Sequence, residues 1–290
     1  MRVVVTGATG NVGTALLARL AADPSIAEIV GVSRRPPAGI DLPRTRFVRA
    51  DVGRDPLEGI LRRADAVVHL AWQIQPSRAP RELWRTNVEG TSRVIAAALA
   101  TGVATLVHAS SVGVYSPGPT RRAVDESWPH DGMPSSFYAR HKAEAEARLD
   151  ALEAAEADIR VVRMRPGLIL SRRAASGVRR LFLGRLVPRA ALAPGRIPVV
   201  PDIPGLRLQA LHSDDAAAAY HRALVTDAAG AFNVAAEPVL DPSTIAQALG
   251  ARAVAVPAGL ARGIVWASWR AGLQPTPPGW LDLALGVPVM

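Results

Sequence analysis

A glycine-rich turn close to the N-terminus restricts the fold of this chain more than any other feature of its sequence. An apolar run at residues 2–6 leads into TGATGNVG at residues 6–13, and a helical pattern follows at residues 12–22. In a strand–turn–helix unit, Gly7 permits the tight turn, Gly10 lets the backbone approach a pyrophosphate, and Gly13 lets helix and strand pack closely. Free N–H groups at the start of the helix then face the phosphates. The turn therefore predicts a dinucleotide-binding site.

The first 170 residues alternate short apolar runs with helical patterns, which is typical of βαβ units on a parallel sheet. We expect strands at residues 2–6, 28–33, 46–50, 66–70, 105–109 and 160–165. We expect helices at residues 12–22, 56–63, 78–100 and 134–157. The predicted fold class is α/β, a doubly wound parallel Rossmann sheet with a smaller C-terminal substrate lobe.

The pattern is less regular after Pro166. Residues 171–210 are rich in Arg, Pro and Gly, with one helical stretch near residues 177–191. Further helices are expected at residues 212–225, 243–249 and 259–271, and a strand at residues 231–235. We expect a dinucleotide-binding domain at residues 1–170, with 211–236 returning to it. Residues 171–210 and 237–290 would form the substrate-binding lobe.

Composition excludes several classes of protein. The chain has no cysteine, which excludes disulfides and thiolate metal ligands, and we expect no metal site. No apolar run reaches the roughly 18 residues that span a bilayer, so we expect a cytoplasmic protein without a membrane partner. The net charge is +9, but basic runs interleaved with aromatic residues are lacking, so we expect no nucleic acid partner. The expected binding partner is therefore a small-molecule substrate.

The residues after the second expected strand indicate which dinucleotide binds. An NAD site usually carries an acid there for the ribose hydroxyls, whereas this chain reads Val32-Ser33-Arg34-Arg35. Arg34 can pair with a 2′-phosphate, so NADP is favoured over NAD; the alternative is that both arginines are solvated. Asp51 and Val52, after the third strand, can meet the adenine, or Asp51 can cap a turn.

Tyr138 and Lys142 form the candidate proton-transfer pair. They lie one helical turn apart and share a helix face. Lys142 is the chain's single lysine among 34 basic residues. An ammonium beside the phenol favours the phenolate, so we expect Lys142 to lower the pKa of Tyr138 from its usual value near 10. The alternative is an ordinary surface tyrosine.

Other polar residues are expected to meet at the carboxyl edge of the sheet. Ser110 and Ser111 close the fifth strand, where a hydroxyl can polarise a substrate carbonyl. Asn87 lies inside a long expected helix, where asparagine is unfavourable, and is read as a buried structural residue or an anchor for a relay water. The tryptophans either line an apolar pocket or pack the core, and Trp72 is the best pocket candidate.

At this point the chain resembles the short-chain dehydrogenase/reductase superfamily, in its extended, epimerase/dehydratase-like branch. The matching segments are TGATGNVG at 6–13, ADV at 50–52, VVHLAW at 67–72, NVEGT at 87–91, LVHASSVGVYS at 106–116, YARHK at 138–142, RPGLIL at 165–170 and LHSDDAAAAY at 211–220. The resemblance implies that Asn87, Ser111, Tyr138 and Lys142 form a catalytic tetrad. It also implies a homodimer built through the helices at 78–100 and 134–157.

The motifs and the resemblance together give a set of candidate binding residues. The cofactor is expected to contact Gly7, Thr9, Gly10, Asn11, Val12, Gly13, Ser33, Arg34, Asp51, Val52, Leu70, Ala71, Trp72, Ala109, Ser110, Tyr138, Lys142, Pro166, Gly167 and Leu168. The substrate is expected to contact Trp72, Ser111, Val112 and Tyr138. Pro166 resembles the residue that borders the nicotinamide in this family.

Departures from the family pattern narrow the expected reaction. Val112-Gly113 stands where sugar-nucleotide dehydratases carry an Asp-Glu pair, so no 4,6-dehydratase activity is expected. RPGLILS at 165–171 lacks the Asn, Tyr and Pro typical of sugar-nucleotide epimerases. We predict NAD(P)-dependent hydride transfer at the carbonyl/alcohol of a small organic substrate.

Two other functions stay open. One is a nucleotide-sugar epimerase with tightly bound NAD, in which the diphosphate would meet arginines 172, 173, 179, 180, 185 and 189. The other is a non-catalytic dinucleotide-binding sensor, which would not need Tyr138 and Lys142 together.

Overall fold

The structure, a computed structural model, describes residues 1–37, 39, 41–75, 77–119, 122–182, 184 and 195–290. Its centre is a seven-stranded sheet in which every pair of neighbouring strands is parallel. In spatial order the strands are β10 (Gly230–Val234), β6 (Arg160–Pro166), β5 (Thr105–Ala109), β4 (Ala66–His69), β1 (Arg2–Thr6), β2 (Glu28–Ser33) and β3 (Thr45–Arg49). The strand order reverses direction between β1 and β4, and ligands of such sheets bind at this switch point.

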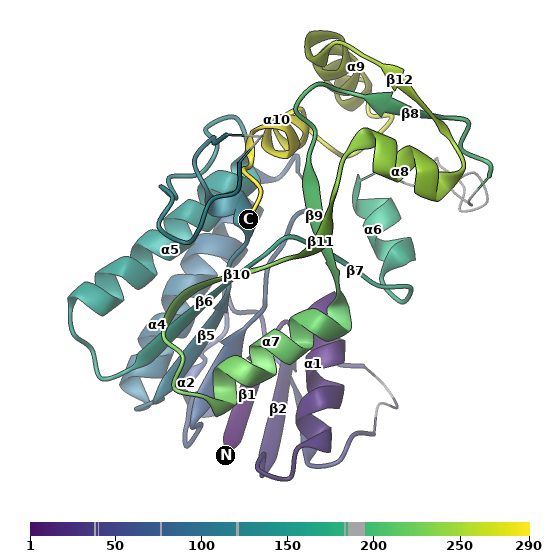
Figure 1. Ribbon diagram of the computed structural model, residues 1–290. Helices are drawn as coiled ribbons and strands as arrows, with labels where there is room; N and C mark the ends of the chain where they lie inside the picture. Colours follow the sequence, from purple (N-terminus) through teal and green to yellow (C-terminus); the bar gives the residue numbers. More distant parts are fainter. Residues whose placement is uncertain (38, 40, 76, 120–121, 183, 185–194) are drawn as a thin grey trace.

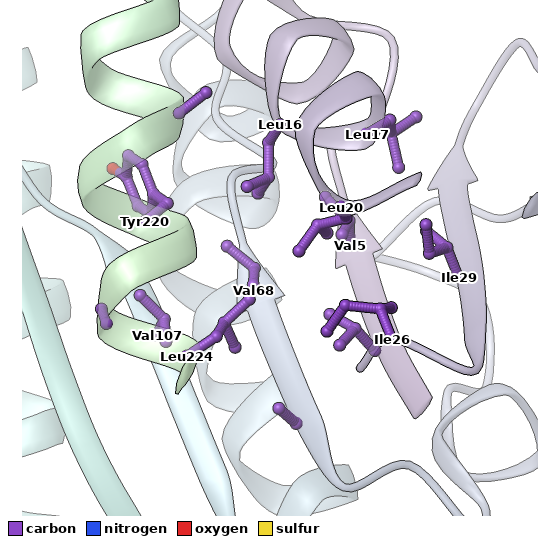
Figure 2. Close-up of a cluster of buried hydrophobic side chains, with 14 of the residues drawn as sticks. Val5, Leu16, Leu17, Leu20, Ile26, Ile29, Val68, Val107, Tyr220 and Leu224 are labelled. Atoms are coloured by element: carbon purple, nitrogen blue, oxygen red, sulfur yellow. The ribbon is translucent and has the colours of Figure 1, made fainter. Parts of the chain in front are cut away.

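Helices cover both faces of the sheet. One face carries α1 (Asn11–Ala22) and α7 (Ser213–Val225), which lie side by side (Figure 1). The other face carries α2 (Glu58–Leu61), α4 (Gly90–Ala100) and α5 (Phe137–Ala154). Side chains alternate across β1, so that Val3 and Val5 belong to the core under α1 and α7 while Val4 belongs to the other. Figure 2 shows the first of these cores, with Leu16, Leu20 and Tyr220 packed over the sheet.

The segments that follow β6, apart from α7 and β10, add a smaller set of elements at the carboxyl edge of the sheet (Figure 1). It has a three-stranded sheet of β11 (Ala236–Leu240), β9 (Leu208–His212) and β7 (Leu168–Leu170), and a strand pair of β8 (Val199–Asp202) with β12 (Arg252–Ala255). Its helices are α6 (Ala175–Phe182), α8 (Pro242–Leu249), α9 (Ala258–Arg270) and α10 (Gly279–Gly286).

The predicted fold class is confirmed, because the sheet is parallel and helices cover both of its faces. The long helix expected at 78–100 is divided into α3 (Pro80–Trp84), the π-helical turn η1 (Arg85–Glu89) and α4. Of the helix expected near 177–191, the structure describes α6, and most of the remainder lies outside the described residues.

The prediction missed β7, β8, β9, β11, β12 and α10. All four residues of β12 are exposed, so no apolar pattern identifies it as a strand.

The part of the chain that the structure describes lacks two kinds of feature, a membrane-spanning helix and a metal-binding group. There, no helix combines the length and the apolar character needed to cross a bilayer. The described His, Asp and Glu side chains also form no group that could hold a metal ion.

Candidate functional site

The glycine turn forms a close-fitting backbone cradle between β1 and α1. A Cβ on Gly7, which has φ +70°, would lie 2.7 Å from the backbone nitrogen of Ala71. A Cβ on Gly13 would lie 2.4 Å from the Gly7 carbonyl oxygen. No side chain caps α1 at Gly10, so the first N–H groups of the helix are directed at the turn. This arrangement fits a pyrophosphate at the helix N-terminus.

A cavity beside the cradle is suited to the adenosine end of a dinucleotide. It is lined by Gly7, Thr9, Gly10, Val32, Ser33, Arg34, Ala50, Asp51, Val52, Leu70, Ala71, Trp72, Gln73 and Thr86. The Ser33 hydroxyl is buried and makes no hydrogen bond within the described residues. Arg34 is exposed and donates to Oε1 of Gln73 at 3.2 Å. An unpartnered buried hydroxyl beside a guanidinium is a suitable donor set for a phosphate.

Asp51 has a local structural role at this end of the site. Its Oδ1 accepts a hydrogen bond from the backbone N–H of Gly53 at 2.9 Å, and its own N–H donates to Asp55. Asp51 therefore caps a turn, which was the alternative to an adenine contact, and it also lines the cavity.

A second, larger cavity runs from the glycine turn to the carboxyl ends of β5 and β6 and has a volume of about 510 Å³. Fourteen of the predicted cofactor residues line it: Gly7, Gly10, Asn11, Val12, Gly13, Leu70, Trp72, Ala109, Ser110, Tyr138, Lys142, Pro166, Gly167 and Leu168. The four predicted substrate residues, Trp72, Ser111, Val112 and Tyr138, line it as well. The remaining predicted cofactor residues line the adenosine-end cavity. The sheet edge thus brings together residues that are far apart in the sequence.

One face of α5 holds the proton-transfer candidates. Tyr138, Lys142 and Glu146 follow one another at four-residue spacing, so they lie on the same side of the helix. Ser136 caps the start of α5 by accepting a hydrogen bond from the N–H of Ala139. The helix is therefore anchored directly before Tyr138.

Lys142 is buried and is held by two contacts. Its Nζ donates to the carbonyl oxygen of Ala109 at 2.6 Å and lies 3.4 Å from the centroid of the Trp72 ring. The second contact is a cation–π interaction. Burial holds the pKa of Lys142 well below its usual value, and the charge of Glu146 acts in the opposite direction.

The expectation that Lys142 lowers the pKa of Tyr138 is wrong for this structure. Burial raises the pKa of the Tyr138 phenol, and the neighbouring Ser111 side chain offsets this only in part. The Lys142 ammonium lies 5.8 Å from the centroid of the Tyr138 ring and is directed at Ala109 and Trp72. The sequence spacing gave the shared helix face correctly but did not reveal what else would hold the lysine.

Ser111 is positioned by a short 3-10 turn, η2 (Val112–Val114), that follows β5. Its hydroxyl accepts a hydrogen bond from the N–H of Gly113 at 3.0 Å, and its interaction with the Tyr138 phenol acts to lower the pKa of that phenol. A Cβ on Gly113 would lie 3.1 Å from Cε1 of Tyr138, so glycine leaves room for that ring. Ser111 and Tyr138 therefore line the same cavity.

Asn87 does not line either cavity. Its side chain is fully buried, its Oδ1 accepts from the N–H of Gln73 at 2.8 Å, and its Nδ2 donates to the Gln73 carbonyl at 2.8 Å. Nδ2 also lies 3.3 Å from Nδ1 of His141. Asn87 thus clamps the loop that carries Trp72, which agrees with the buried structural reading of this residue.

A buried ion pair fastens α5 to β6 behind the site. The fully buried carboxylate of Glu146 accepts from Nε of Arg165 at 2.9 Å and from the hydroxyl of Ser110. Arg165 also donates to the Tyr115 hydroxyl at 3.0 Å. Burial alone would lower the pKa of Arg165, but the hydrogen bonds and charge of Glu146 raise it above its usual value. This pair was not predicted, because its partners are 19 residues apart in the sequence.

Aromatic side chains surround Tyr138. Trp72 was the best pocket candidate from the sequence, Trp280 was one of the tryptophans left open between pocket and core, and Phe182 was not predicted. The ring of Trp280, on α10, lies 4.8 Å from the Tyr138 ring at 35°. Trp72 meets Tyr138 edge-on at 6.1 Å, and Phe182 meets Trp280 edge-on at 5.0 Å. In the sequence, the presence of tryptophans was the one indication of an aromatic pocket wall, and tryptophans are equally suited to core packing.

Comparisons with known proteins agree with this geometry. The sequence profile described as "NAD dependent epimerase/dehydratase family" matches residues 3–235. An uncharacterized protein of Mycobacterium tuberculosis (strain ATCC 25618 / H37Rv) is 31% identical over a 277-residue alignment that covers 88% of this chain and 67% of that protein.

Solved structures have the same fold. The UDP-N-acetylglucosamine 4-epimerase from Methanobrevibacter ruminantium M1, in complex with UDP-N-acetylmuramic acid, superposes with a TM-score of 0.70 at 19% identity, covering 88% of this chain and 84% of that one. DesIV, a dTDP-glucose 4,6-dehydratase from Streptomyces venezuelae with NAD and TYD bound, gives 0.70 at 24%, covering 89% and 84%. At these identities the similarity shows the fold alone.

Proposed function

The chain belongs to the NAD dependent epimerase/dehydratase family, and on that premise we propose that it is an NADP-dependent oxidoreductase acting at the carbonyl/alcohol of a small organic substrate. One observation carries the proposal. The side chains of Tyr138 and Ser111 line the same cavity, which also reaches the glycine turn. A pure binding protein has no need of this pair.

The residues of this chain provide for proton transfer and orientation. A bound nicotinamide would supply or accept the hydride with its two electrons. In the direction of reduction, Tyr138 donates its proton to the carbonyl oxygen, and Ser111 holds that oxygen by a hydrogen bond. Because burial raises the pKa of Tyr138, the phenol is protonated at neutral pH, which is the state that a proton donor needs.

Lys142 and Asn87 support this step in different ways. Once Tyr138 has given up its proton, the phenolate favours the ammonium form of Lys142, and the ammonium in turn favours the phenolate. Asn87 acts as a positioning residue, because it fixes the backbone of Gln73 next to Trp72, on whose ring the lysine lies. The turn at Val112 and Gly113 offers no carboxyl group, so dehydration of a sugar nucleotide is not part of the proposed activity.

Preference for NADP is supported by Arg34 and the unpartnered hydroxyl of Ser33. We expect Arg34→Asp to lower the affinity for NADPH relative to NADH by about thirtyfold or more, because it replaces a phosphate-binding cation with an acid. The measurement is the dissociation constant of each cofactor by fluorescence titration.

Arg35→Asp is the matched control, because Arg35 is exposed and does not line the adenosine-end cavity. It makes the same change in net charge one residue away. If both variants shifted the ratio of the two affinities equally, the effect would be long-range electrostatics and the role of Arg34 would be wrong.

A further inference from the structure

We propose that the substrate is an apolar carbonyl compound, such as an aryl or alkyl ketone, and that Trp280 on α10 is the residue that selects it. The inference rests on the proposed function, since it concerns the same cavity and the same Tyr138. It goes further by giving the substrate a chemical class.

Most of the side chains that line the cavity beyond Tyr138 are apolar. The apolar ones are Trp72, Ile74, Val112, Phe182, Leu208, Trp280, Leu283, Ala284, Val287, Pro288 and Val289. They come from the loop after β4, from η2, from α6, from β9 and from the C-terminal segment with α10. Binding of a substrate against this wall is favoured in proportion to the apolar area that the contact removes from water.

Most polar groups on this wall are already bonded within the chain. Gln209 is paired through both side-chain atoms with the backbone of Met290, at 3.2 Å and 2.7 Å. Asn11 donates to the carbonyl oxygen of Ile169 at 3.0 Å and accepts from the hydroxyl of Ser171. The Ser111 and Tyr138 hydroxyls lie on the same cavity and are placed to hold one oxygen atom of a substrate.

The charges of the cavity do not suit a nucleotide diphosphate. Arg207 is the one guanidinium among the described lining residues beyond Tyr138. A diphosphate placed in an apolar cavity needs several charged or N–H partners to offset its loss of hydration. Arg172, Arg173 and Arg179 do not line this cavity but a neighbouring cleft against α1 and α7, which shares Asn11, Leu170 and Phe182 with it. Arg185 and Arg189 lie outside the described residues.

Trp280 is held rigidly enough to act as a selector. Its ring lies against Tyr138 at 4.8 Å and receives the edge of Phe182 at 5.0 Å. The start of α10 has no space for a side chain at Gly279, where a Cβ would lie 2.2 Å from the Ser135 carbonyl oxygen. Asp282 accepts two hydrogen bonds from Arg262, which joins α10 to α9. A flat apolar substrate reaching Tyr138 would therefore contact a preorganised indole.

The test compares three compounds with the full chain and NADPH: acetophenone, hydroxyacetone and UDP-glucose. We expect kcat/KM for acetophenone to exceed that for hydroxyacetone by about a hundredfold, the ratio that burying a phenyl ring supports. UDP-glucose should neither bind in calorimetry nor be epimerised. Faster reduction of hydroxyacetone, lost in Tyr138→Phe, would overturn the apolar class and leave the proposed function intact. Reduction of neither ketone would overturn both.

Variants of Trp280 test the selector separately. We expect Trp280→Ala to raise KM for acetophenone at least tenfold, with kcat changed less than about threefold, and Trp280→Phe to restore most of the loss. The dissociation constant for NADPH should not change. Trp266→Ala is the matched control, because Trp266 is 53% exposed on α9 and does not line the cavity. Equal effects of the Trp280→Ala and Trp266→Ala variants would contradict the assignment.

Discussion

Replacing Tyr138 with phenylalanine is expected to lower kcat for carbonyl reduction about a thousandfold, the usual contribution of a positioned general acid. The substitution removes one oxygen atom and leaves the ring against Trp72 and Trp280. Binding of NADPH should stay within about twofold, since the hydroxyl is proposed to act on the substrate. Steady-state kinetics and a cofactor titration on the same sample measure both quantities.

Tyr115→Phe is the matched control for this prediction. The Tyr115 hydroxyl is buried in the network with Arg165 and Asn233 and does not line the cavity. Its removal should cost about 1 kcal/mol of stability and leave kcat nearly unchanged. A Tyr138→Phe protein that kept most of its activity would rule out the proposed role of Tyr138.

The second large effect is expected from Glu146→Gln, on stability. The substitution keeps the shape of the side chain but removes the charge that offsets the buried Arg165 guanidinium. Breaking a buried ion pair on one side usually costs 3–5 kcal/mol, and we expect about 3 kcal/mol here because Tyr115 and the Glu126 carbonyl still accept from Arg165. Urea unfolding measures the change in the free energy of unfolding.

Glu144→Gln makes the same change on the same helix at the surface. Glu144 pairs with Arg148 one turn away at 2.7 Å, and both side chains are partly exposed. Such a pair contributes about 0.3–0.5 kcal/mol. A destabilisation of the Glu146 variant no larger than that of the Glu144 variant would show that the buried pair does not hold α5 on β6.

The dinucleotide end of the site could be predicted because its determinants are local. The three glycines of the turn lie directly between the strand and the helix that they join. Their spacing is sufficient to predict where the backbone can approach a pyrophosphate. The four-residue spacing of Tyr138 and Lys142 was likewise sufficient to place both on one helix face. The alternation of short apolar runs with helical patterns was enough to predict the parallel sheet.

The rest of the site depends on contacts between distant segments. No sequence pattern predicts that Asn87 binds the backbone of Gln73, or that Lys142 lies on the Trp72 ring. The raised pKa of Tyr138 follows from burial, which spacing does not reveal. Trp280 reaches the cavity from α10, more than a hundred residues after Tyr138, and only the packing of the C-terminal segment brings the two rings together.

Transfer of a deuterium label tests the central claim of hydride transfer most directly. NADPH in which deuterium replaces both hydrogens at C4 of the nicotinamide ring is incubated with the protein and whichever of acetophenone and hydroxyacetone it reduces faster. We predict one deuterium on the new alcohol carbon for each NADPH oxidised, at a rate that falls about a thousandfold in Tyr138→Phe. Product formed without deuterium, or without net oxidation of NADPH, would contradict the account.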